Sequence, residues 1–121
     1  MRLFVAVWPP PALVERLRSM ERPGLPGVRW TTEDQWHVTL RFLGALDAAC
    51  CEDLLGALGR VTAGCSPVEV TASGAPRGLG QAAWVLPVDG LGRLALAVTQ
   101  TTASFGRPPD RRSYRGHLTL A

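Results

Sequence analysis

The chain has 121 residues, of which 46% are hydrophobic, and this size favours one compact domain spanning residues 1–121. Its net charge is +3, and all 13 of its basic Lys/Arg positions are arginine. Because the sequence contains no lysine, covalent catalysis through a lysine Schiff base is excluded. No apolar run reaches the roughly 20 residues that a membrane helix needs, so we expect no membrane partner. The 3 cysteines lack CxxC spacing, which favours a reducing, cytoplasmic location.

The first half of the chain reads as two strands that alternate with two helices. Alternating apolar residues predict a strand over 2–8, and the prolines that follow close it and start a helix over 11–22. A loop leads to a second predicted strand over 36–44. Asp47 is suited to capping a helix that runs over 50–61.

The second half reads as shorter elements joined by polar loops. Its predicted elements are a strand over 67–73, a loop over 75–81, a strand over 82–88 whose proline indicates an edge position or a bulge, a helix over 91–105, an arginine-rich loop over 106–116 and a last strand over 117–121. Strands and helices are interspersed without the regular alternation of a doubly wound sheet. The order therefore favours an α+β fold.

One internal repeat stands out. The segment 37–40, His-Val-Thr-Leu, recurs at 117–120 as His-Leu-Thr-Leu, and these two segments contain both histidines of the chain. Each copy lies near the end of a comparable strand-rich half, which predicts two similar lobes facing each other.

Side-chain alternation along the second strand separates a polar face from an apolar face. The polar face is expected to carry His37, Thr39 and Arg41, and the apolar face Val38, Leu40 and Phe42. The same rule puts His117 and Thr119 on one face of the last strand. If the lobes pack against each other, both polar rows converge on one cleft.

This combination of residues matches the needs of phosphodiester chemistry. One group must take a proton from the attacking hydroxyl and another must give a proton to the leaving oxygen, and histidine serves both roles because its unperturbed pKa is about 6.5. Threonine hydroxyls can donate hydrogen bonds to the non-bridging oxygens. We therefore predict His37 and His117 as the catalytic pair, with Thr39, Thr119 and also Arg41 as phosphate-binding residues. The sequence shows no metal site and implies no cofactor.

The whole chain resembles the 2H phosphoesterase superfamily, and within it the RNA 2′,3′-cyclic phosphodiesterases, also called the 2′-5′ RNA ligase family. Besides the two motifs, the resemblance is carried by the opening RLFVAVWPPP, by VRWTTEDQWHVTLRFLG, by the Arg-Gly-x-Gly stretch before AAWVLPV, and by RRSYRGHLTLA. It implies a bilobal α+β fold in which two antiparallel-sheet lobes, with helices outside, face each other across a central groove.

The resemblance also implies an activity. This activity is metal-independent hydrolysis of RNA or nucleotide 2′,3′-cyclic phosphodiesters to 2′-phosphates, with reversible 2′-5′ ligation in some members. By resemblance alone, His37 is the proton donor and His117 the proton acceptor. Two departures are evident: Gly116 stands where relatives often have proline, and the chain ends at Ala121 whereas relatives continue. We therefore expect a chain truncated at the C-terminus, with an incomplete C-terminal lobe.

Other side chains near the motifs have candidate roles. Arg111, Arg112 and Arg115 could steer an anionic substrate, and Trp36 and Tyr114 could stack on a base, with core packing favoured for Trp36. Alternative functions are a non-catalytic RNA or nucleotide-binding module, a protein-interaction domain that pairs through its sheet edge, and a hydrolase of ADP-ribose 1″,2″-cyclic phosphate. The sequence gives no sign of an obligate protein partner.

Overall fold

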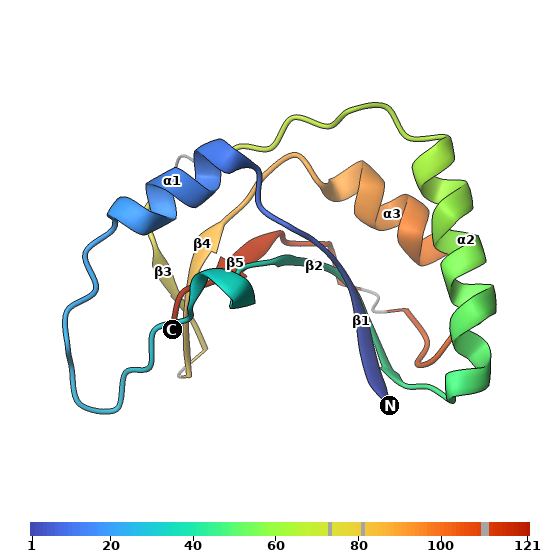
Figure 1. Ribbon diagram of the computed structural model, residues 1–121, viewed down its shortest axis with the longest axis horizontal. Coiled ribbons are helices and arrows are strands. Elements are labelled where there is room, and N and C mark those ends of the chain that lie inside the picture. The colour runs from blue at the N-terminus through green and yellow to red at the C-terminus, as the bar shows by residue number, and fades with distance from the viewer. Residues whose placement is uncertain (73, 81, 110–111) are drawn as a thin grey trace.

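The computed structural model describes residues 1–72, 74–80, 82–109 and 112–121, and its helices and strands are interspersed along the chain (Figure 1). The elements in order are β1 (Arg2–Val7), α1 (Pro11–Ser19), the 3-10 turn η1 (Glu33–Gln35), β2 (Val38–Ala45), the 3-10 turn η2 (Ala48–Cys50), α2 (Cys51–Ala63), β3 (Arg77–Leu79), β4 (Ala83–Pro87), α3 (Gly92–Thr101) and β5 (His117–Thr119). The predicted α+β class is confirmed.

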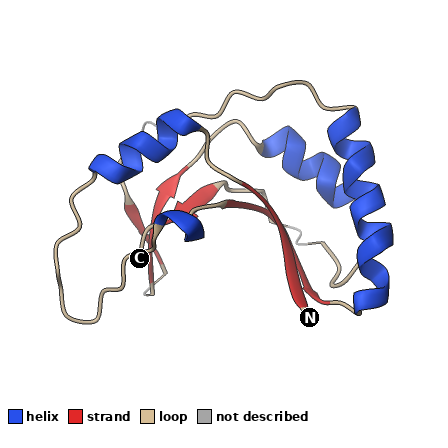
Figure 2. Ribbon diagram, viewed as in Figure 1, coloured by secondary structure: helices blue, strands red, loops and turns tan. Residues whose placement is uncertain are grey.

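The strands form one antiparallel sheet in the order β1-β2-β5-β4-β3 (Figure 2). The antiparallel pair β1–β2 and the group β5–β4–β3 meet where Val38 of β2 pairs with Leu118 of β5. The two strands that carry the repeated motifs are therefore direct neighbours, and they join the two halves of the sheet.

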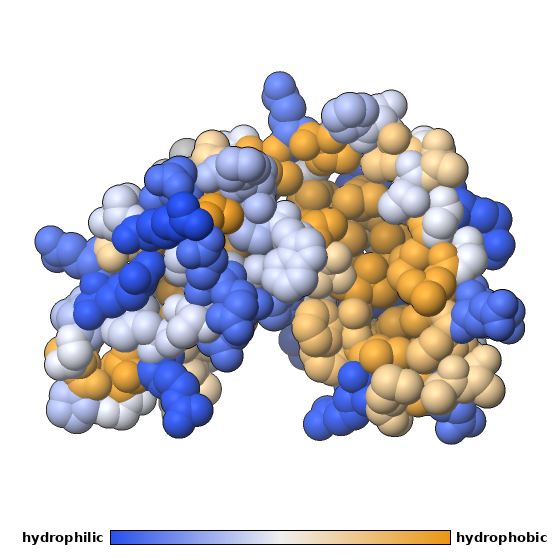
Figure 3. All heavy atoms as spheres, in the orientation of Figure 1, coloured by the Kyte–Doolittle hydropathy of each residue, from blue (hydrophilic) through white to orange (hydrophobic). Residues whose placement is uncertain are grey.

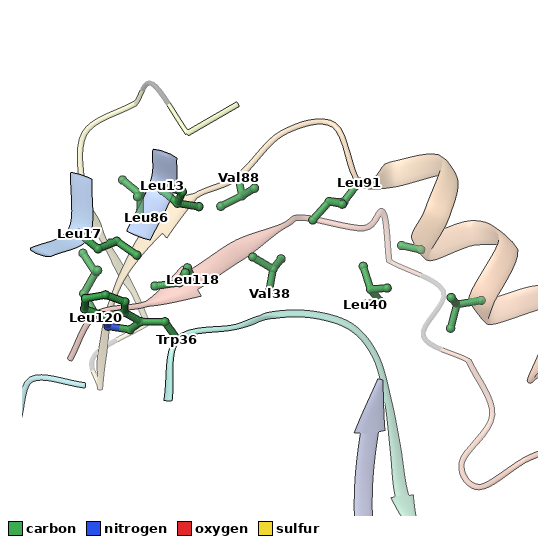
Figure 4. Close-up of a cluster of buried hydrophobic side chains, with 12 residues drawn as sticks. Leu13, Leu17, Trp36, Val38, Leu40, Leu86, Val88, Leu91, Leu118 and Leu120 are labelled. Carbon is green, nitrogen blue, oxygen red and sulfur yellow. The ribbon is translucent and has the colours of Figure 1, made fainter. Parts of the chain in front are cut away.

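The main apolar core of the described residues lies between the sheet and the helices. Figure 4 shows Leu13 and Leu17 of α1 near Leu86, and Val38 near Leu118. Helix α3 packs mainly against β2, although it follows β4 in the chain, and α1 contributes to the core beneath β4 although it follows β1. The helices α1 and α3 thus bridge the two halves, whereas α2 packs against α3. Full burial of each leucine contributes about 1.5–3 kcal/mol to this joint core.

Strand β2 departs from regular alternation. In the antiparallel pair, Ala6 of β1 is paired with Thr39 and its neighbour Val5 is paired with Arg41. Leu40 therefore has no partner in β1 and is an extra residue in β2. Such a bulge reverses the alternation beyond it. The predicted faces of Arg41 and Phe42 are therefore wrong: Arg41 is 6% exposed and turns toward the helices, while Phe42 is 51% exposed on the opposite face.

The structure describes residues 67–72 of the strand predicted over 67–73, and Ser73 lies outside the described residues. Residues 67–72 form no strand, so the prediction is wrong for them. Only Thr71 pairs there, in an isolated bridge with Asp89. The third strand forms instead at 77–79, within the predicted loop. Gly80, with φ of 60°, follows it directly and lets the chain reverse, so that 77–79 pair with 83–85.

Hydrophobic and hydrophilic residues divide one face of the molecule into two areas. In Figure 3 hydrophobic side chains gather on the right, between the strands β1 and β2 and the helices α2 and α3, whereas hydrophilic side chains cover α1 and the loop after it. Among the described residues, none of the helices has the length and apolar character needed to cross a membrane.

Candidate active site

The sheet register brings the two motifs together on one face. Val38 and Leu118 are paired, and each is at most 1% exposed in the core. Because side chains alternate, the residues on either side of this pair point to the opposite face of the sheet, which no helix covers in the described part of the chain. In an antiparallel pair, the histidine of one motif then lies across from the threonine of the other. This face therefore carries His37, Thr39, His117 and Thr119, the four motif residues that the sequence singles out.

The two histidines have the same local geometry. The Nδ1 atom of His37 lies 2.8 Å from the carbonyl oxygen of Gln35, and that of His117 lies 3.0 Å from the carbonyl oxygen of Arg115. A carbonyl oxygen only accepts, so each Nδ1 carries the hydrogen. Each Nε2 is then an acceptor in neutral imidazole and a donor in imidazolium. Both rings are set up to exchange a proton at Nε2.

The segment before His37 is held by its own capping bonds. The side chain of Gln35 accepts a hydrogen bond from the backbone N–H of Thr32 at 3.0 Å, which closes the turn η1. Trp36 is 3% exposed, and its indole N–H donates to the hydroxyl of Thr31 at 3.2 Å. The structure confirms the preferred interpretation of Trp36 as a core residue, and this anchor fixes the position of His37.

Each motif strand is also held by a side chain that precedes the other motif. The Tyr114 hydroxyl donates to the Thr39 carbonyl oxygen at 2.8 Å, and the Thr31 hydroxyl donates to the Thr119 carbonyl oxygen at 2.9 Å. Burial raises the pKa of Tyr114, so its phenol remains a donor. Tyr114 is half-buried against the core and positions the backbone; the structure does not place its ring as a base-stacking platform.

The ring of Phe4 lies beside His37, and the ring of Phe42, which alternation placed on the other face, stacks on Phe4. The Phe4 ring centroid is 4.9 Å from that of His37, at an interplanar angle of 32°, and it stacks on Phe42 at 5.9 Å. Phe4 is 45% exposed, so the rings form an accessible apolar surface next to the imidazole. The position of Phe42 depends on the β2 bulge and could not be read from the sequence pattern.

Arg41 is not available to a phosphate at this site, which corrects the sequence prediction. One terminal nitrogen of its guanidinium donates to the carbonyl and hydroxyl oxygens of Thr102, and the other donates to the carbonyls of Phe105 at 3.0 Å and Arg107 at 2.7 Å. Burial lowers the pKa of Arg41. The side chain caps the C-terminal end of α3, where a positive charge is favourable.

The three arginines predicted to steer a substrate differ in what the structure shows of them. Arg111 lies outside the described residues, and Arg112 is exposed. Arg115 is exposed and lines a cavity of about 330 Å³, together with Arg77, which the sequence pattern did not single out. Within the described ranges, no group of three or more His, Cys, Asp or Glu side chains is placed to hold a metal ion.

Comparisons with known proteins bear on the family and the fold of the chain. A family model described as LigT like Phosphoesterase matches residues 7–76, a range that contains the first motif. The crystal structure of E. coli LigT in apo form is similar to this chain, with a TM-score of 0.72 and 25% sequence identity, over 98% of this chain and 70% of that chain. No curated protein sequence matches this chain.

Proposed function

The chain belongs to the LigT-like phosphoesterase family, a family of 2H phosphoesterases, and on that basis we propose that it hydrolyses RNA or nucleotide 2′,3′-cyclic phosphodiesters to 2′-phosphates in the cytoplasm. The matched histidines carry the proposal: each has Nδ1 bonded to a backbone carbonyl and Nε2 left for proton transfer. A simple binding module has no need for two such rings on neighbouring strands.

The mechanism uses the two rings in opposite protonation states. Neutral His117 takes a proton at Nε2 from a water molecule, whose oxygen attacks phosphorus. The bond from phosphorus to O3′ breaks, and protonated His37 gives its Nε2 proton to that oxygen, leaving a 2′-phosphate. The hydroxyls of Thr39 and Thr119 donate to the non-bridging oxygens as negative charge builds on them. The assignment of donor and acceptor follows the family resemblance, and 2′-5′ ligation is the same transfer with a ribose hydroxyl replacing water.

The decisive experiment measures turnover of adenosine 2′,3′-cyclic phosphate by the purified 121-residue chain in EDTA, with the product regiochemistry assigned. We expect adenosine 2′-phosphate, a bell-shaped pH dependence of kcat/KM, and a loss of about 10²–10⁴-fold in His37→Asn and in His117→Asn. In each variant one limb of the pH profile should disappear. Arg60→Ala, an exposed change on α2, is the control and should retain the wild-type rate and profile.

Other outcomes would select a different function. A folded chain that binds adenosine 2′-phosphate without any turnover would identify a non-catalytic nucleotide-binding module. A 3′-phosphate product would show that the bond to O2′ breaks, contrary to the proposal. Turnover that survives in both histidine variants would remove the acid–base pair from the mechanism.

A further inference from the structure

A cavity of about 330 Å³ adjoins the second motif and plays no part in the proton transfers described above. It is lined by the end of β4 and the start of α3, by the segment 114–116, and by Arg77 of β3. Pro87, one of its lining residues, is the strand partner of His117. The cavity therefore lies next to β5, the strand that carries this histidine.

Arg77 lies on the same face of the sheet as the motif residues. It pairs with Val85, and Val85 pairs with Thr119, so these three side chains form one row across β3, β4 and β5. Neighbouring strands are about 4.8 Å apart, which places the backbone of Arg77 about 10 Å from that of Thr119. A group held by Arg77 is thus close to a phosphate held by Thr119 but distinct from it.

The charges around the cavity favour an anion. Arg77 and Arg115 are both exposed, and neither guanidinium has a hydrogen-bond or ion-pair partner within the described part of the chain. Asp89 also lines the cavity and is the one carboxylate among the lining residues that the structure describes, so it partly opposes their charge. Two free guanidinium groups near one space suit a phosphate, because the planar fork donates paired hydrogen bonds to its oxygens.

We propose that this cavity binds a second phosphate of the substrate, the 5′-phosphate of the nucleotide whose 2′,3′-cyclic phosphate is cleaved. In an oligonucleotide this group is the internucleotide phosphodiester next to the terminal cyclic phosphate. The inference rests on the proposed function and specifies its substrate class as 3′ ends of RNA chains and 5′-phosphorylated nucleotides, in preference to nucleosides that carry only the cyclic phosphate.

The test compares adenosine 2′,3′-cyclic phosphate with and without a 5′-phosphate, since the two substrates differ only in the group concerned. We expect the wild-type chain to favour the 5′-phosphorylated substrate about tenfold or more in kcat/KM. Arg77→Ala and Arg115→Ala should each reduce this preference by about tenfold, the effect of one lost charge-assisted hydrogen bond. Asp89→Asn should increase it, and the control Arg60→Ala should leave it unchanged.

A binding measurement separates this inference from the proposed function. Calorimetric titration with adenosine 2′-phosphate and adenosine 2′,5′-bisphosphate needs no turnover. Tighter binding of the bisphosphate that depends on Arg77 supports the cavity site even in a chain that hydrolyses nothing. Equal binding of the two ligands, or a preference that both arginine variants retain while their circular dichroism shows the native fold, would overturn the inference whether or not the chain is active.

Discussion

Tyr114 is one residue whose contribution to the site can be isolated, because its hydroxyl makes one hydrogen bond, to the carbonyl of Thr39. Tyr114→Phe removes this bond and retains the ring, so we expect the free energy of unfolding to fall by about 1 kcal/mol. The strand carrying Thr39 loses its anchor, and kcat should fall while both limbs of the pH profile persist. Urea unfolding and the pH dependence of kcat/KM test this; an unchanged kcat would show that Tyr114 does not position the first motif.

Arg41 offers the opposite case, a charged residue whose role is structural. Arg41→Met removes the guanidinium that donates to the carbonyl oxygens of Thr102, Phe105 and Arg107. The Thr102 carbonyl keeps the backbone N–H of Phe105 as a donor, whereas the part-buried carbonyls of Phe105 and Arg107 lose this bond, so we expect a loss of about 1–3 kcal/mol in the free energy of unfolding. At a temperature where the variant is folded, KM for adenosine 2′,3′-cyclic phosphate should stay within about twofold of wild type. Urea unfolding and steady-state kinetics measure these two quantities, with exposed Arg2→Met as the control. A large rise in KM without loss of stability would restore Arg41 as a phosphate ligand.

At the scale of elements, β2 shows how much of the site could be predicted from sequence. His37 and Thr39 lie before the bulge at Leu40, so simple alternation assigns them correctly to one face, opposite Val38. The bulge arises from pairing with β1, a long-range contact that the local pattern of β2 does not contain. The same limit explains Arg77, whose role depends on a hairpin that forms at Gly80.

The helix α1 and the turn η1 are joined by an exposed ion pair that should respond to pH. The hydrogen bond from Arg18 lowers the pKa of Glu33 from the ordinary value of 4.5. Desolvation opposes this shift, and the charge of Arg18 adds to it. A carboxyl with a lowered folded-state pKa stabilises the fold above its unfolded pKa, and this contribution is lost as the pH falls through the folded-state value.

We therefore expect Glu33→Gln to lower the urea midpoint slightly at neutral pH, with the difference from wild type shrinking below about pH 4.5 as Glu33 protonates. The pair is fully exposed, so salt should weaken the effect. Urea titrations from neutral to acidic pH measure it, with Glu21→Gln as the control. A difference that grows toward acid would contradict the assigned direction of the pKa shift.

At the scale of the whole molecule, the two halves are held by a shared core as well as by strand pairing. Helix α3 follows β4 but packs on β2, and α1 follows β1 but packs in the core beneath β4. The apolar face of the β1–β2 half is covered by α3, which follows β4 of the other half. The apolar face of the β5–β4–β3 half is covered by α1, which follows β1. The two histidines therefore keep their relative positions only when both halves are folded.

Leu118 tests this dependence, because it is fully buried at the point where the halves meet. Leu118→Ala removes apolar contacts in the shared core, and we expect a loss of about 2–5 kcal/mol. Because the core is common to both halves, unfolding should remain a single transition, with the same urea midpoint from tryptophan fluorescence and from far-ultraviolet circular dichroism. Leu55→Ala, at a side chain that is 69% exposed, is the matched control and should cost far less. Two separate midpoints would show that each half folds alone, and the site would then depend on docking of two preformed units.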